Sequence, residues 1–336
     1  MATYKRQRYL LMTTDQVHIG TGGYRLGRVD NSIVREPGTR IPKIPGTSLH
    51  GAARSYAAQL YETPEAAGQS QDKVDNPDQN PVCYTFGYIK KSQTDDETTA
   101  YSGVVNVFDA HVLLFPVHSM AGPVWVSTPS RLHEAAFTVG SVPQNWDTGA
   151  ALLTWPRTDP LNLGWLMVSI SNKATVTAPN EWEDTEQWKA VCDRLVLVQQ
   201  SLFSQVVNSN LEVRTSVAID PQRGAAEDKA LFTYEALPRA TFLTAEVVLD
   251  DYRQAFPQKQ CGASKTDKGN PLPGGAWNGP LDVVRAGLRM IEWLGVGGMG
   301  TRGFGRLAIV GEPLEVEYGQ ISEPSSPQSQ GEEVSQ

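Results

Sequence analysis

The 336-residue sequence predicts an α+β fold in which helices cover one side of a sheet. Segments dense in Val, Leu, Ile and Phe, typical of strands, alternate along the chain with segments of helical periodicity. Long polar, turn-rich segments separate them, as in a domain that carries insertions. A modified ferredoxin-like core satisfies this order of elements, although the pattern alone does not select it.

The expected elements follow in chain order. Residues 9–14 form a first strand, a glycine-rich turn with Gly20 and Gly22 comes next, and Thr47 or Ser48 caps a helix over residues 49–61. The later elements are strands at 103–117, 165–170, 211–219, 241–249 and 307–310, and helices at 129–136, at 181–203 and ending at Leu294.

We expect one elaborated domain over residues 1–319. Residues 63–80 and 92–100 are polar and predict surface insertions, so that 63–100 and 136–165 are the two insertion regions. Residues 320–336 are rich in Ser, Pro, Gln and Glu, which predicts a disordered tail.

The composition excludes several classes of protein. No run approaches the roughly 20 apolar residues that a membrane helix needs, and the N-terminus lacks a signal-peptide pattern. Cys83, Cys192 and Cys261 lie far apart and form no CxxC pair. We therefore expect neither a membrane partner nor a structural zinc or disulfide framework, and a reducing cytoplasm fits this cysteine usage.

The charge is unevenly distributed. The net charge is −8, but residues 1–54 hold nine Lys and Arg against three Asp and Glu, whereas residues 312–336 hold six acids and no base. The N-terminal segment could form a basic face that attracts phosphate, although charge alone does not predict nucleic-acid binding.

A glycine-rich segment over residues 295–305 carries six glycines and is followed by Arg306. It imitates a dinucleotide fingerprint, yet it follows a helical pattern and leads into a strand, the reverse of a Rossmann loop. Backbone contact with nucleic-acid phosphate at Gly298, Arg302 and Gly303 is one interpretation, and a flexible turn between helix and strand is the other.

Five segments in order carry a family resemblance. They are His18-Ile19-Gly20-Thr21-Gly22 with residues 26–36, the Pro45-Gly46-Thr47-Ser48-Leu49-His50-Gly51 helix start, Phe108-Asp109-Ala110 through Phe115-Pro116-Val117, residues 214–238, and the glycine-rich segment. Together they resemble the RAMP superfamily of CRISPR systems. Residues 26–36 and 123–129 make the chain most similar to the backbone subunit of the type III-B (Cmr) effector complex.

This resemblance implies a ferredoxin-like, RNA-recognition-like palm with a β-hairpin thumb over about residues 212–242. In such a family, copies of the subunit stack into a helical filament along a CRISPR RNA, together with other effector subunits. Each thumb displaces a base pair between guide and single-stranded target RNA, and an aspartate beside it cleaves the target at regular intervals in antiviral defence. Mapped onto this sequence, that aspartate is Asp30.

The chemistry expected of Asp30 follows from its carboxylate. RNA supplies its own nucleophile, the 2′-hydroxyl, so the protein needs to orient it and offset charge on the phosphate. Asp30 could hold Mg²⁺ or Mn²⁺, which often binds through one or two carboxylates, or it could act as general base. The structural alternative is an Asx turn at Asp30-Asn31. His18 is a second catalytic candidate, and a buried structural histidine is its alternative.

The expected RNA contacts fall into three groups. Gly20, Gly22, Arg28 and Arg35 surround the catalytic candidate, and Ser48, His50 and Arg54 lie near a helix start where capping is the alternative. In the thumb, Arg214 and Arg223 could hold phosphate while Ile219, Leu231 and Phe232 wedge between bases; an ordinary hairpin packed on its own core is the alternative.

Most tryptophans lie in apolar periodic stretches, so core packing is expected for them rather than base stacking. Two other functions compete with a metal-dependent endoribonuclease. One is a non-catalytic architectural guide-binding subunit, and the other is a RAMP nuclease that trims the CRISPR precursor with histidines.

Overall fold

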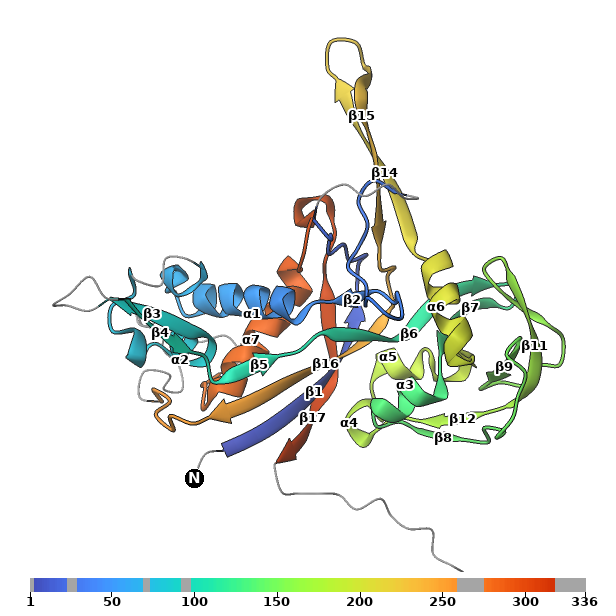
Figure 1. Ribbon diagram of the computed structural model, residues 1–336, viewed down its shortest axis with the longest axis horizontal. Helices are drawn as coiled ribbons and strands as arrows, with labels where there is room; N and C mark the ends of the chain where they lie inside the picture. Colours follow the sequence, from blue (N-terminus) through green and yellow to red (C-terminus); the bar gives the residue numbers. More distant parts are fainter. Residues whose placement is uncertain (1–2, 23–28, 69–72, 92–97, 259–274, 318–336) are drawn as a thin grey trace, which may run out of the picture.

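The computed structural model describes residues 3–22, 29–68, 73–91, 98–258 and 275–317, arranged as a palm, a lobe and a projecting hairpin (Figure 1). Predictions for Arg28, Cys261 and the 320–336 tail lie outside the described residues.

The palm is a four-stranded antiparallel sheet in the order β6-β16-β1-β17. Its strands are β1 (Thr3–Thr13), β6 (Ala110–Ser119), β16 (Phe242–Asp251) and β17 (Leu307–Glu317). Helix α1 (Gly46–Leu60) connects the first pair in sequence, and α7 (Pro280–Leu294) connects the second. This βαββαβ order with antiparallel neighbours is the ferredoxin-like topology, and it confirms the predicted α+β class.

The two palm helices pack closely against each other over the sheet (Figure 1). A Cβ atom at Gly287 of α7 would lie 2.1 Å from the backbone oxygen of Ala53 in α1, so only glycine allows this approach. The sheet itself is buried on both faces, as period-two alternation in β1 requires: Tyr9 and Leu11 pack under the helices, whereas Leu10 packs on the opposite side.

The opposite side belongs to a lobe that continues the main sheet beyond β6. The additional strands follow the order β7-β13-β9-β11-β10. They are β7 (Gly122–Ser127), β13 (Leu195–Leu197), β9 (Ala150–Leu153), β11 (Leu166–Lys173) and β10 (Leu161–Leu163), while β8 (Thr138–Gly140) pairs with β12 (Thr175–Thr177). The predicted insertion 136–165 thus supplies a fully buried strand, β9, to the sheet.

The predicted helix at 181–203 is wrong. This segment contains α4 (Asn180–Glu183), α5 (Glu186–Lys189), η4 (Cys192–Arg194), strand β13 and the start of α6 (Gln200–Ser209). Its apolar spacing reflects burial rather than one helix, because Trp188 and Leu195 are both core residues and Leu195 pairs with Trp125 of β7. The shorter α3 (Pro129–Glu134) occurs where a helix was expected, with Thr128 as its cap.

The segment 63–100 is more than a surface insertion. It forms η1 (Pro64–Ala66), η3 (Pro77–Gln79), α2 (Pro81–Phe86), β3 (Gly87–Lys91) and the first residues of β4 (Thr98–Ser102). Every residue of α2 is buried, and its apolar side chains join the main core. Two short palm strands complete the sheet, β2 (Lys43–Ile44) beside β6 and β5 (Val105–Val107) beside β16.

The start of α1 corrects the predicted cap. The helix begins at Gly46 with Pro45 as N-cap, and neither Thr47 nor Ser48 caps it. Instead, the backbone N–H of Gly46 donates to Oδ1 of Asp109 at 2.7 Å, so a carboxylate from the start of β6 satisfies the helix terminus. Because a Cβ at Gly46 would lie 2.3 Å from the backbone oxygen of Val107, the helix start must be glycine.

Candidate functional site

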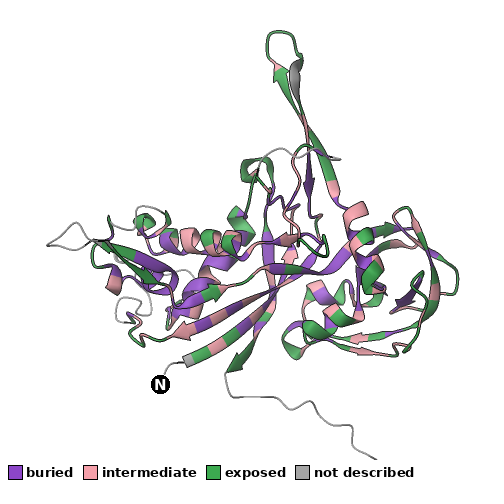
Figure 2. Ribbon diagram, in the orientation of Figure 1, coloured by how far each residue is buried: buried purple, intermediate pink, exposed green. Residues whose placement is uncertain are grey.

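A two-stranded hairpin projects from the palm beyond the main body, and we call it the thumb (Figure 1). Its strands are β14 (Glu212–Asp220) and β15 (Ala225–Ala236), which pair antiparallel around a turn that ends at Gly224 with a φ of 62°. Figure 2 shows that its outer part is largely exposed, whereas the base of β15 is buried. The thumb therefore cannot be an ordinary hairpin packed along its length on its own core.

Apolar side chains remain exposed along the outer thumb. Ile219 and Leu231 are 60% and 64% exposed, and Val217, which pairs directly with Leu231, is 41% exposed. Paired residues in an antiparallel ladder share one face, so Val217 and Leu231 form one apolar surface. Such a surface on a projecting hairpin indicates contact with another molecule.

Asp30 lies on an exposed turn that is bound to the base of the thumb. Its Oδ2 accepts hydrogen bonds from the backbone N–H and the hydroxyl of Thr233, at 2.7 and 2.9 Å. Asn31 continues the contact, since its N–H donates to the Thr233 carbonyl at 3.0 Å. These bonds, first the backbone N–H of Thr233, lower the pKa of Asp30 below its usual value, so the group is a carboxylate at neutral pH.

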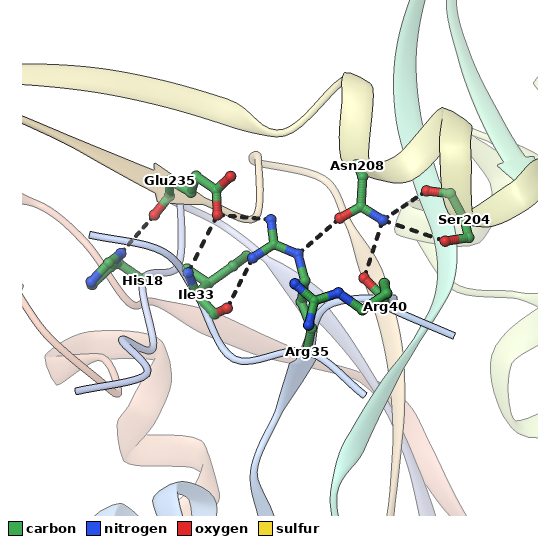
Figure 3. A network of polar contacts seen from close by, with 7 residues as sticks. All are labelled: His18, Ile33, Arg35, Arg40, Ser204, Asn208 and Glu235. Atoms are coloured by element: carbon green, nitrogen blue, oxygen red, sulfur yellow. Dashed lines mark hydrogen bonds and ion pairs between the residues drawn. The ribbon is translucent and has the colours of Figure 1, made fainter. Parts of the chain in front are cut away.

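A polar network joins the residues that follow Asp30 in the chain to β15 and α6 (Figure 3). Arg35 forms an ion pair with Glu235 at 2.7 Å, and the two side chains are only 11% and 10% exposed. Arg35 also donates to the Ile33 carbonyl at 3.0 Å and to Oδ1 of Asn208 in α6 at 2.9 Å. The Asp30 loop is thus tied to both the thumb and the lobe.

This network corrects the role expected of Arg35. All three nitrogen positions of its guanidinium have protein partners, so it positions the loop instead of presenting charge to a phosphate. His18 is likewise buried: its Nδ1 lies 2.6 Å from the carbonyl oxygen of Glu235, and its own carbonyl accepts from the N–H of Gly298 at 3.0 Å. The structure therefore places His18 as a packing residue below the surface that Asp30 occupies.

The glycine-rich loop lies beside the same thumb base. The Phe304 ring packs edge-on against Tyr234 of β15 at 5.4 Å, and Arg214 of β14 lies over Phe304 at 5.6 Å. Gly298, Arg302 and Gly303 are exposed, as are Gly20 and Gly22 on the neighbouring 18–22 segment. The fold thus brings together Asp30, the two predicted glycine-rich turns and the thumb base, from three distant parts of the chain.

Three residues of α1, Ser48, His50 and Arg54, were predicted to contact RNA, and two of them contact other parts of the protein. The Arg54 guanidinium donates to the carbonyls of Ala66 and Gly87 at 2.9 and 2.8 Å, and so it anchors the 63–91 segment. His50 packs edge-on against Phe86, and burial lowers its pKa, which favours the neutral ring. Among the described residues, no hydrogen bond or ion pair links Ser48, His50 or Arg54 to the Asp30 turn.

The thumb residues also separate into two sets. Phe232 is half-buried at the thumb base, where its ring lies 6.0 Å from Tyr234, whereas Ile219 and Leu231 are exposed on the outer thumb. Arg223 is at the exposed tip, 3.7 Å from Asp220, while Arg214 donates to Glu212 at 2.6 Å near the base.

Asp30 has the character of a single carboxylate ligand. Within the described part of the chain, no group of three or more His, Cys, Asp or Glu side chains is arranged to hold a metal ion. The Asp30 side chain is exposed, so its carboxylate is accessible from solvent. This donor set fits a hydrated Mg²⁺ or Mn²⁺ that takes its other ligands from water and phosphate.

Residue-by-residue reasoning missed the groups that fix Asp30. Thr233 carries no sequence signal for this role, and Asn208 lies in α6 beyond the end of the predicted 181–203 helix, where no element was expected. Glu235 was part of a segment that carries the family resemblance, but no partner was assigned to it.

Among described helices, none is long and apolar enough to cross a membrane.

Comparisons with known proteins agree with this architecture. The family model described as RAMP superfamily matches residues 10–308. The CRISPR system Cmr endoribonuclease Cmr4 of Pyrococcus furiosus is 25% identical over 255 residues, covering 71% of this chain and 80% of that protein. A Csm3 endoribonuclease of Mycobacterium tuberculosis is 41% identical over a short stretch of 51 residues, 15% of this chain and 22% of that protein.

Solved structures share the fold. A chain of the type III-B Cmr-beta complex bound to cognate target RNA aligns with a TM-score of 0.57 at 13% identity, covering 91% of this chain and 96% of that one. Oligomeric Cmr4 from Pyrococcus furiosus aligns with a TM-score of 0.50 at 19% identity, covering 94% and 99%.

Proposed function

The chain belongs to the RAMP superfamily, and on that premise we propose that it is a backbone subunit of a type III CRISPR effector complex that cleaves target RNA. It would bind a CRISPR RNA together with further copies of itself and other effector subunits. The observation that carries the proposal is the exposed Asp30 carboxylate, fixed by Thr233 at the base of a thumb with an apolar outer surface.

The thumb would displace a base pair, and the Asp30 carboxylate would act at the phosphate. Ile219 and Leu231 would enter the guide–target duplex and displace a base pair, because apolar side chains replace base stacking at moderate cost. The displaced target nucleotide would then lie at the thumb base, where its ribose and phosphate are free of helical stacking. The 2′-hydroxyl can only attack in line when the backbone has this freedom.

The cleavage step is an internal transfer. The 2′-oxygen forms a bond to the adjacent phosphorus, and the bond from phosphorus to the 5′-oxygen breaks. The proton of the 2′-hydroxyl passes to water, and the leaving 5′-oxygen takes up a proton from water. The products are a 2′,3′-cyclic phosphate and a 5′-hydroxyl. Asp30 is a poor proton acceptor because its pKa is lowered, so its role is to hold charge and position near the phosphate.

We include metal dependence in the proposal. The exposed Asp30 carboxylate would hold Mg²⁺ or Mn²⁺, which when bound would offset the negative charge that develops on the phosphate. Arg302, exposed on the neighbouring loop, adds a fixed positive charge from the protein itself.

The test uses the assembled complex with labelled RNA complementary to its guide, in Mg²⁺ or Mn²⁺. We expect a ladder of evenly spaced products, and Asp30→Asn should reduce it at least about 10²-fold while guide binding stays unchanged. Asp184→Asn, which alters an exposed carboxylate on the lobe, is the matched control and should cut normally.

The alternative is an architectural subunit without cutting activity. It predicts that the wild-type complex binds guide and target but yields no ladder with either metal. A ladder that persists in Asp30→Asn would instead remove this residue from the mechanism.

A further inference from the structure

Two tryptophans contradict the expectation of core packing. Trp182, Trp188 and Trp277 are buried, but Trp165 and Trp293 are 73% and 75% exposed. Trp165 lies in the turn between β10 and β11 on the lobe, whereas Trp293 lies in the last turn of α7, directly before the glycine-rich loop. The exposed indole of Trp293 requires an explanation because it lies next to the proposed RNA surface.

Hydrogen bonds fix the backbone next to Trp293. The preceding Ile291 is buried, and its carbonyl accepts the N–H of Gly295 at 2.9 Å. The hydroxyl of Tyr56 in α1 donates to the Gly295 carbonyl at 2.6 Å, and the Val296 N–H donates to the Gly305 carbonyl at 2.9 Å. These bonds fix the end of α7, so the indole is presented at little conformational cost.

The surroundings of Trp293 suit a polyanion with flat, apolar bases. Gly297, Gly298, Gly300 and Gly303 leave exposed backbone without side chains directly after it. Among the described residues, the guanidinium of Arg302 makes no ion pair or hydrogen bond, and it lies over the Phe232 ring at 5.9 Å. On α7, Arg289 lies one turn before Trp293 and is 56% exposed, with its nearest carboxylate, Glu312, 3.9 Å away.

A protein partner fits this surface less well. In the described part of α7 and the glycine-rich loop, Trp293 and Leu294 are the only large apolar side chains that are exposed. A stable protein interface buries about 800 Å² on each partner around a well-packed apolar centre, and two side chains beside bare glycine backbone do not supply that. One aromatic ring with neighbouring arginines is instead the usual means of binding single-stranded nucleic acid.

We propose that Trp293 is a stacking platform for one unpaired base of the bound single-stranded RNA. The RNA backbone would cross the exposed glycines at 297–303, where Arg302 contacts phosphate. This inference rests on the proposed RNA-binding function and adds a base-binding residue outside the thumb and the Asp30 turn.

The experiment measures the affinity of the purified full-length protein for fluorescently labelled single-stranded RNA by anisotropy. Trp293→Ala should weaken binding about 5- to 100-fold, and Trp293→Phe should keep most of the affinity because a phenyl ring still stacks. Trp165→Ala is the matched control, since it removes an equally exposed tryptophan far from the glycine-rich loop, and it should bind like wild type. Thermal unfolding of each variant checks that the fold is kept.

A second arm identifies the contact as stacking. An abasic nucleotide placed at successive positions of the RNA should weaken wild-type binding at one position, and Trp293→Ala should be insensitive to that same change. Unchanged affinity of Trp293→Ala overturns the inference, and so does an equal loss in Trp165→Ala. A variant that binds RNA normally but loses self-association in sedimentation assigns Trp293 to a protein contact. Failure of the wild-type protein to bind RNA would refute the proposed function itself.

Discussion

Replacement of Arg35 by Met tests whether the ion pair beneath the Asp30 turn sustains the fold. The change leaves the Glu235 carboxylate, which is 10% exposed, with the Ile33 N–H at 3.4 Å as its remaining donor among the described residues, and it removes the donor to Asn208. Removing one partner of a buried pair costs about 3–5 kcal/mol, and the slight exposure of this pair places the expected cost near about 3 kcal/mol.

The corresponding shift in melting temperature is small but measurable. An unfolding entropy of about 2.1 cal/mol/K per residue gives about 0.7 kcal/mol/K for a chain of 336 residues. Arg35→Met should therefore lower Tm by about 4 °C in differential scanning calorimetry. Lys189→Met breaks the exposed pair with Asp184 and is the matched control, for which we expect a shift of about 1 °C or less.

The double variant separates a stranded charge from lost packing. Arg35→Met with Glu235→Leu removes both charges, and replacing a buried pair with apolar groups is often nearly neutral. We expect it to recover at least half of the lost stability, with the remaining deficit of about 1–1.5 kcal/mol due to the unpaired polar groups of Ile33 and Asn208. Equal Tm losses in Arg35→Met and Lys189→Met, or a double variant no better than Arg35→Met, would refute this reasoning.

Three further predictions concern other parts of the site. Serine at both Ile219 and Leu231 should leave guide binding intact but reduce cleavage at least tenfold, because the wedge is lost; a normal ladder in a gel assay contradicts the role of the thumb. Gly46→Ala should lower Tm by several degrees, since its Cβ would lie 2.3 Å from a backbone oxygen, whereas Gly51→Ala has open space and should not. The lowered pKa of Asp30 means that its hydrogen-bonded carboxylate form persists through neutral pH and is lost only as pH falls through that lowered value. The cleavage rate should consequently show no acidic inflection between about pH 5 and 8, and an inflection there in an intact complex would contradict the assignment.

Local pattern predicted the four palm strands and both palm helices. Strand residues that alternate in burial, the helix before the glycine-rich loop and the turn at the thumb tip all depend on residues close in sequence. The segment 181–203 was misread because buried residues in short helices and a strand can have the spacing of one long amphipathic helix.

Within the site, the sequence proposed Asp30, the glycine-rich turns and the thumb, and the structure places them near one another. Arg35 and Arg54 were expected to contact RNA, yet their guanidinium groups bind protein carbonyls and side chains. An arginine that satisfies buried acceptors and one that faces solvent look alike in a sequence. Phe232 was also placed at the wedge, although it packs at the thumb base.

The amino-acid sequence by itself determined the α+β class, the thumb and the presence of a carboxylate in a polar turn, because periodicity, turn chemistry and residue type are local properties. Only the tertiary structure decided which groups surround that carboxylate. Asp30 and Thr233 are 203 residues apart along the chain, and Arg35 and Glu235 are 200 apart. Their contacts arise when the thumb returns to the first loop across the folded palm. Side-chain exposure, which distinguishes Trp293 from the buried tryptophans, depends on that same packing.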